Sequence, residues 1–165
     1  MKIRPKTVTI LMADDDEDDG LLVREALAES QFSFNLHIVS NSEELLDYLY
    51  NRGLYADKTR ATRPGLILLD LNMPIKNGLE VLQEIKTDTS LRTIPVIILS
   101  TSEDQQDIYQ SYALGANSFI TKPVTFVGLV EIMETIGKYW FEIAQLPLEL
   151  LGERNEAKPN QSSIN

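Results

Sequence analysis

The chain has 165 residues, of which 43% are apolar and 24% are charged, and these proportions exclude wholesale disorder. Twenty-five acidic side chains against fifteen basic ones give a net charge of −10, which argues against nucleic acid as a partner because a phosphate backbone would be repelled. Cysteine is absent, which excludes disulfides and thiolate zinc sites, and no apolar run reaches the roughly 18 residues of a membrane helix. We therefore expect one cytoplasmic domain that does not contact a membrane.

Short apolar runs alternate with amphipathic stretches along the chain, a pattern that is typical of βαβ units and a parallel sheet. The expected strands are residues 8–13, 36–39, 65–70, 95–99 and a short fifth strand within 115–121. The third and fourth runs are apolar without alternation, as expected of central parallel strands that are buried on both faces. The pattern predicts an α/β protein.

Apolar residues at helical spacing lie between these runs. The expected helices are residues 18–28, 41–53, a third that begins at Asn77, 104–114, and a long last helix from Phe126 to about residue 143. Leu79, Leu82 and Ile85 form the expected core face of the third helix. Five strands that alternate with five helices predict a small doubly wound sheet.

The predicted domain occupies residues 7–144, and residues 145–165 are expected to form a C-terminal extension. The segment GERNEAKPNQSSIN, which follows Leu151, contains a single apolar side chain besides alanine. Such a segment cannot bury enough apolar surface to fold, so we expect disorder beyond about residue 151.

Polar residues follow four of the predicted strands directly. Asp14 and Asp15 follow the first, Asp70 ends the third, Ser100 follows the fourth and Lys122 follows the fifth. The carboxyl ends of parallel strands share one edge of a doubly wound sheet, so these side chains should converge on one crevice. Three carboxylates brought together repel one another unless a cation or protons compensate them. Oxygen ligands select a hard ion, which predicts Mg²⁺ with Mn²⁺ or Ca²⁺ as possible substitutes.

These residues, in this order, resemble the receiver domain of two-component response regulators. The resemblance covers roughly residues 7–137 and includes the motifs LLDLNMPIKNG around Asp70, PVIILSTS around Ser100 and FITKP around Lys122. It implies a flavodoxin-like fold with strand order 2-1-3-4-5. It also implies that Asp70 accepts a phosphoryl group from a sensor histidine kinase, and that the protein is not an enzyme but assists its own phosphorylation and dephosphorylation.

The resemblance further assigns roles to individual residues. Asp15, Asp70 and the backbone carbonyl of Asn72 would bind Mg²⁺, and Asp14 would act through a bound water. Lys122 would neutralise the phosphoryl oxygens, and Ser100 would donate its hydroxyl to the phosphoryl group. Ser100 and an inward-turning Phe119 would form the switch that alters the face of the fourth helix and fifth strand. The Lys122–Pro123 peptide bond is expected to be cis, as the resemblance implies.

The last helix and the Leu-Pro segment, IGKYWFEIAQLPLEL, resemble those of phytochrome-associated response regulators, which lack a DNA-binding domain. Too few residues follow Lys122 for an output domain, so we expect signalling to an unknown downstream protein through protein contacts, and a bacterial phytochrome as a possible kinase. Ile132, Tyr139 and Ile143 lie off the core stripe of this helix, from which we hypothesise a homodimer contact.

Other interpretations of the acidic residues and of Asp70 fit the sequence less well. Asp16 to Asp19 are interpreted as a solvated helix start, since acids favour a helix N-terminus. A calcium loop fails in both registers, because either the required glycine or the final glutamate is missing. A haloacid-dehalogenase-like phosphatase needs a second aspartate at the position of Asn72. A receiver-like binding module that is never phosphorylated is the remaining alternative.

Overall fold

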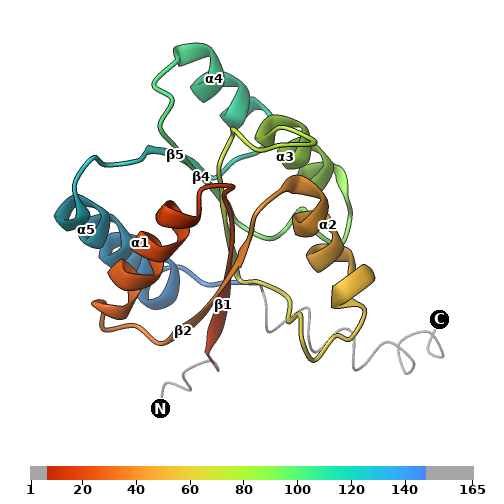
Figure 1. The fold of residues 1–165 in the computed structure, drawn as a ribbon, viewed down its shortest axis with the longest axis horizontal. Coiled ribbons are helices and arrows are strands. Elements are labelled where there is room, and N and C mark those ends of the chain that lie inside the picture. The colour runs from red at the N-terminus through yellow and green to blue at the C-terminus, as the bar shows by residue number, and fades with distance from the viewer. Residues whose placement is uncertain (1–6, 148–165) are drawn as a thin grey trace.

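The computed structural model describes residues 7–147, in which a parallel sheet lies between two layers of helices (Figure 1). The strands are β1 (Val8–Ala13), β2 (Phe34–Val39), β3 (Leu66–Leu69), β4 (Val96–Ser100) and β5 (Ser118–Thr121). They lie in the order β2-β1-β3-β4-β5 and all pairs are parallel. The doubly wound fold and its strand order are therefore confirmed.

Each α-helix in this part of the chain begins after a polar side chain that accepts a hydrogen bond from the first turn. The helices are α1 (Glu17–Ala28), α2 (Ser42–Tyr50), α3 (Gly78–Thr87), α4 (Gln105–Ala113) and α5 (Phe126–Gly137), with a 3₁₀ turn η1 (Gly53–Tyr55) after α2. The helix predicted for residues 41–53 ends early, because Asn51 adopts a left-handed conformation with φ 55°.

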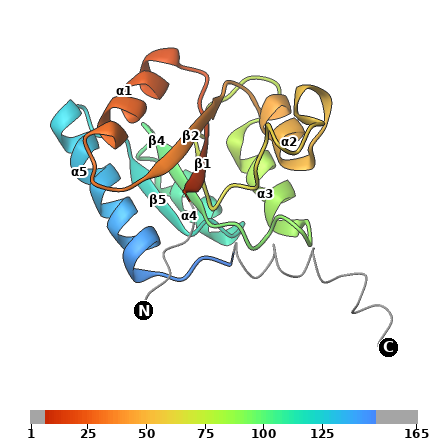
Figure 2. The same ribbon diagram turned by 90° about the horizontal axis from the view of Figure 1, so that it is seen from below.

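Helices cover both faces of the sheet, with α1 and α5 on one face and α2 and α3 on the other (Figure 2). Successive residues of a strand point to opposite faces, so Leu11 of β1 packs toward α2 and α3 while Ile10 packs toward α1 and α5. The same division holds in β3, where Ile67 and Leu68 face opposite layers. Burial on both sides explains why the central strands show no polar alternation.

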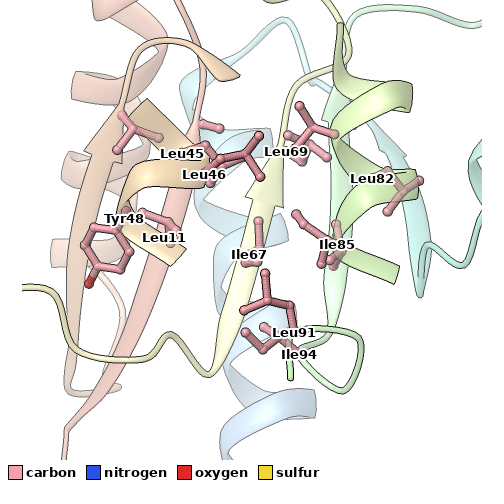
Figure 3. Packing of buried hydrophobic residues seen from close by; sticks show 14 of the residues in the cluster. Leu11, Leu45, Leu46, Tyr48, Ile67, Leu69, Leu82, Ile85, Leu91 and Ile94 are labelled. Atoms are coloured by element: carbon pink, nitrogen blue, oxygen red, sulfur yellow. The ribbon is translucent and has the colours of Figure 1, made fainter. Parts of the chain in front are cut away.

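The core between the sheet and the layer of α2 and α3 is built mainly from aliphatic side chains, with the ring of Tyr48 among them (Figure 3). Leu45 and Leu46 of α2 and Leu82 and Ile85 of α3 are all buried there. Leu79, expected on this core face, is only partly buried, and Val81 is fully buried. The predicted core face of α3 is therefore confirmed, and Val81 widens it.

The last helix continues beyond Gly137 as a π-helical segment, η2 (Lys138–Ile143). Phe141 in η2 packs against Phe32 and Phe34 at ring-centroid distances of 6.3 and 6.4 Å, which ties the segment to the start of β2. The predicted extension to about residue 143 is confirmed in extent, but its last turns are π and not α. The segment predicted to be disordered beyond residue 151 lies outside the described residues.

Among residues 7–147, none of the helices is long and apolar enough to span a bilayer.

Candidate functional site

The carboxyl ends of β1 and β3 bring the three predicted carboxylates together. The two strands pair up to Ala13 and Leu69, and the Asp70 N–H then donates to the Ala13 carbonyl oxygen at 3.0 Å. Asp14, Asp15 and Asp70 each present a carboxylate oxygen, and these oxygens lie within 4.8 Å of one another. The sheet edge therefore forms the acidic crevice predicted from the sequence.

Burial sets the electrostatics of this crevice. Asp14 and Asp70 are almost fully buried, with exposed fractions of 2% and 7%, whereas Asp15 is exposed. Burial raises the pKa of Asp14 to about 6 and also raises the pKa of Asp70, because a charged carboxylate is disfavoured away from water. A hard divalent cation would compensate this charge, and the exposed Asp15 leaves the site open to solvent.

Lys122 reaches the crevice from the end of β5 and contacts carboxylates from three elements. Its Nζ lies 2.7 Å from Asp14 Oδ2 and 2.6 Å from Asp19 Oδ2, but 3.7 Å from Asp70 Oδ2. Burial alone would lower the pKa of Lys122, yet the hydrogen bonds to Asp14 and Asp19 raise it above its ordinary value. The ammonium is therefore a fixed positive charge beside Asp70.

The interpretation of Asp16 to Asp19 as a solvated helix start is wrong for Asp19. We expected Asp16 to Asp19 to face water at a helix start, and Asp16 does cap α1 by accepting from the Asp18 N–H. Asp19, in the first turn of α1, instead pairs with Lys122. The sequence gives no local sign of this contact, because the two residues are 103 positions apart. Several acids also lie next to one another here, so the sequence does not indicate which of them is paired.

The expected cis bond before Pro123 is wrong in this structure, since every peptide bond in residues 7–147 is trans. The Lys122 N–H donates to the Ser100 carbonyl oxygen at 2.8 Å, which fixes the Lys122 backbone against the end of β4. From this trans backbone the long side chain still reaches Asp14 and Asp19, so the cis form is not needed to bring the ammonium to the crevice.

The remaining predicted residues are Ser100 on β4, Asn72 just after Asp70, and Phe119 on β5. Ser100 is fully buried at the end of β4, and its Oγ accepts a hydrogen bond from the Ser102 N–H at 3.2 Å. Asn72 is exposed, and its N–H lies 3.4 Å from Asp70 Oδ1. Phe119 of β5 is partly buried against the core under α2 and α3, and its N–H donates to Tyr112 Oη in α4 at 3.2 Å.

Gly78 is a site residue whose role the sequence reasoning missed. The helix is predicted to begin at the preceding residue, Asn77, and a Cβ at residue 78 would lie 2.5 Å from the Asp70 carbonyl oxygen. The first turn of α3 thus packs directly on the backbone of Asp70. The signal available in the sequence is the glycine itself, placed at the first position of a helix that closely follows Asp70.

The fold and the site define a doubly wound α/β protein whose acidic crevice fits a divalent cation. A family model described as response regulator receiver domain matches residues 10–134, and the chain belongs to this family.

Named relatives agree with this assignment. Response regulator Rcp1 of Synechocystis sp. is 38% identical over 138 residues, which cover 84% of this chain and 92% of Rcp1. The phosphorylated cyanobacterial phytochrome response regulator RcpA is similar in structure, with a TM-score of 0.79 at 42% identity over 86% of this chain and 99% of RcpA. The Mn²⁺-bound form of Rcp1 gives a TM-score of 0.77 at 37% identity over 85% of this chain and 99% of that one. The predicted resemblance to phytochrome-associated response regulators is confirmed.

Proposed function

We propose that this receiver accepts a phosphoryl group on Asp70 from a sensor histidine kinase and passes the signal on through altered protein contacts. One observation carries the proposal. The Asp70 carboxylate is nearly buried at the end of β3, within 4.8 Å of two further carboxylates and 3.7 Å from the Lys122 ammonium. A nucleophile beside fixed positive charge and a cation site is the arrangement that phosphoryl transfer needs.

The cation in this proposal is Mg²⁺, with Mn²⁺ or Ca²⁺ able to substitute. Asp15, Asp70 and the Asn72 carbonyl would hold it directly, and Asp14 would act through water. The hydrogen bonds of Asp14 support this division, because Oδ1 already accepts from the Asp16 N–H and Oδ2 from Lys122. The Mn²⁺-bound form of the similar protein Rcp1 supports a divalent cation here.

In the transfer step an Asp70 carboxylate oxygen attacks the phosphorus of a phosphohistidine. The new P–O bond forms as the P–N bond breaks, and the imidazole nitrogen leaves with the electron pair of that bond and takes up a proton. Lys122 stabilises the charge that develops on the phosphoryl oxygens. A bound Mg²⁺ would add Lewis-acid stabilisation of the same oxygens. In this proposal the protein is a phosphoacceptor that assists its own phosphorylation and dephosphorylation. It is not an enzyme that acts on a separate substrate.

Output from the phosphorylated state would pass through Ser100 and Phe119. The phosphoryl group adds about −1.5 to −2 charges and three acceptor oxygens, to which the Ser100 hydroxyl can donate. The position of Ser100 at the buried end of β4, with Phe119 on neighbouring β5, supports a coupled movement of the two side chains. The hydrogen bond from the Phe119 N–H to Tyr112 links this pair to α4.

The proposed partners are proteins. A bacterial phytochrome is the proposed kinase, because the similar protein RcpA is a phytochrome response regulator. Residues 7–144 would act as the receiver in the cytoplasm, and its signal would pass to a downstream protein. Tyr139 and Ile143 are 51% and 60% exposed, which supports a homodimer contact that light scattering with and without phosphorylation would test.

Incubation with acetyl phosphate and Mg²⁺, followed by intact-mass measurement, tests the phosphoacceptor. We expect a gain of one phosphoryl group that requires the metal and that Asp70→Asn abolishes, since the amide removes the nucleophilic oxygen while keeping the shape. A parent protein that gains no mass would favour a binding module that is never phosphorylated. A gain that survives Asp70→Asn would place the phosphoryl group elsewhere.

A further inference from the structure

We propose that Asp19 is a positioning residue that restrains Lys122 and thereby slows phosphoryl transfer to Asp70. This inference rests on the proposed function and adds a residue that sets the rate of phosphoryl transfer to Asp70. It starts from the distances around one nitrogen atom, since Lys122 Nζ is closer to Asp19 Oδ2, at 2.6 Å, than to Asp70 Oδ2, at 3.7 Å.

These distances separate a hydrogen bond from a longer-range attraction. An ammonium to carboxylate hydrogen bond is roughly 2.7–2.9 Å long, so the contacts of Lys122 with Asp14 and Asp19 qualify and the approach to Asp70 does not. In this arrangement the ammonium is held toward the β1 and α1 side of the crevice. Two of its three N–H donors are committed to Asp14 and Asp19, and these two hydrogen bonds oppose a shift of the ammonium toward a phosphoryl group on Asp70.

Asp19 is the partner that can be altered without touching the metal site. The carboxylates that converge as a cation site are Asp14, Asp15 and Asp70, and Asp19 is not among them. Asp14 is also fixed by the Asp16 N–H and is almost fully buried, whereas the Asp19 side chain is partly exposed on the first turn of α1. Asp19 therefore acts on the reaction through Lys122.

The charge and the position of Asp19 favour a slower phosphoryl transfer to Asp70 over a faster one. Asp19 partly neutralises the ammonium that should stabilise the phosphoryl oxygens, and its own negative charge repels a phosphoryl group that brings about two more. A cation held by Asp15 and Asp70 would not be coordinated by Asp19, because Asp19 does not belong to that cluster. Loss of the charge at residue 19 should release Lys122 toward Asp70.

The test compares rates of phosphorylation by acetyl phosphate at saturating Mg²⁺ for the parent, Asp19→Asn and Asp19→Glu. We expect Asp19→Asn to be faster by roughly 3- to 10-fold, the effect of one partly screened charged neighbour. Asp19→Glu keeps the charge on a longer side chain that can still reach Lys122, so its rate should return toward that of the parent. Saturation is checked for each protein by a Mg²⁺ titration of the rate.

Asp18→Asn is the matched control, because Asp18 is an exposed acid of the same helical turn with no Lys122 contact. It removes the same formal charge from the helix N-terminus, and its rate should equal that of the parent. Thermal unfolding of all four proteins shows whether each is folded.

If the parent is phosphorylated but Asp19→Asn is no faster, or is slower, the restraint is overturned while the proposed function stands. If Asp18→Asn accelerates equally, a general charge effect replaces it. Failure of the parent to be phosphorylated overturns both.

Discussion

Gly78 shows how the backbone of a neighbouring helix packs against the backbone of Asp70 and Leu71. A Cβ at residue 78 would lie 2.5 Å from the Asp70 carbonyl oxygen and 2.6 Å from Leu71 Cα. Both are backbone atoms, which cannot rotate away as the end of a side chain can. The Gly78 N–H also donates to the Leu71 carbonyl oxygen at 2.8 Å. The absence of a side chain at residue 78 therefore allows α3 to hold the Asp70 segment in place.

We expect Gly78→Ala to lower the free energy of unfolding by about 1–3 kcal/mol, the usual cost of overpacking a filled site. It should also slow phosphorylation, because relief of the clash displaces the Asp70 backbone. Urea unfolding and the acetyl phosphate assay measure the two effects. Gly20→Ala is the control, since its Cβ would meet only the Ile38 side chain, at 3.0 Å, and alanine favours the helix. Equal losses in the two variants would contradict this account.

The residues of the site differ in how far the sequence alone could place them. Asp14, Asp15, Asp70 and Lys122 follow apolar runs, and the rule that strand ends share an edge is enough to bring them together. The pairing of Lys122 with Asp19 depends on which way one long side chain turns, which no local pattern encodes. The trans Lys122–Pro123 bond likewise differs from the family expectation, and only the structure shows that the ammonium reaches its partners without a cis bond.

Among the secondary-structure elements, η2 differs from the sequence prediction in its helix type, and it also packs against the start of β2. Helical spacing predicted that the last helix extends to about residue 143, but it could not distinguish α from π geometry. Phe141 lies edge-on to Phe32 at 67° and nearly parallel to Phe34 at 28°. These contacts join the end of α5 to the start of β2, so η2 is packed as part of the receiver.

We expect Phe141→Ala to lower the free energy of unfolding by about 1–3 kcal/mol, less than a fully buried phenylalanine because this ring is half-buried. Glu142→Ala, in the same segment but exposed, should change it by less than about 0.5 kcal/mol. Urea unfolding of the two variants measures the difference. A Phe141→Ala protein as stable as Glu142→Ala would mean that η2 contributes no packing energy to the domain.

The strands and helices were predicted with different success for a physical reason. Burial on both faces leaves an uninterrupted apolar run, so β1, β3 and β4 were placed to within one residue. Helix ends depend on capping and on single backbone conformations, such as the left-handed Asn51 that ends α2. The strand β2 lies at the sheet edge, and its exposed Asn35 interrupts the pattern that would have shown its beginning at Phe34.

At the scale of the whole molecule, the crevice places buried negative charge in a chain whose net charge is already −10. Asp14 has its pKa raised by burial to about 6, against an ordinary value of 3.8. The folded state therefore takes up a proton at a higher pH than the unfolded state does, and folding gains stability as the pH falls toward 5. His37 acts in the opposite sense, because burial lowers its pKa and disfavours its protonation in the folded state.

We therefore expect that, without divalent metal, the free energy of unfolding of the parent rises relative to Asp14→Asn as the pH falls from about 7.5 to about 5. The rise should be about 1 kcal/mol, the linkage expected for a single carboxyl whose pKa lies near 6 in the folded state. Taking the difference between the two proteins removes the contribution of His37, which they share. Saturating Mg²⁺ should stabilise the parent most at the higher pH, where Asp14 and its neighbours are ionised. Urea unfolding at each pH, with EDTA and with Mg²⁺, measures both effects. A difference that is independent of pH would show that the ionisation of Asp14 is not coupled to folding.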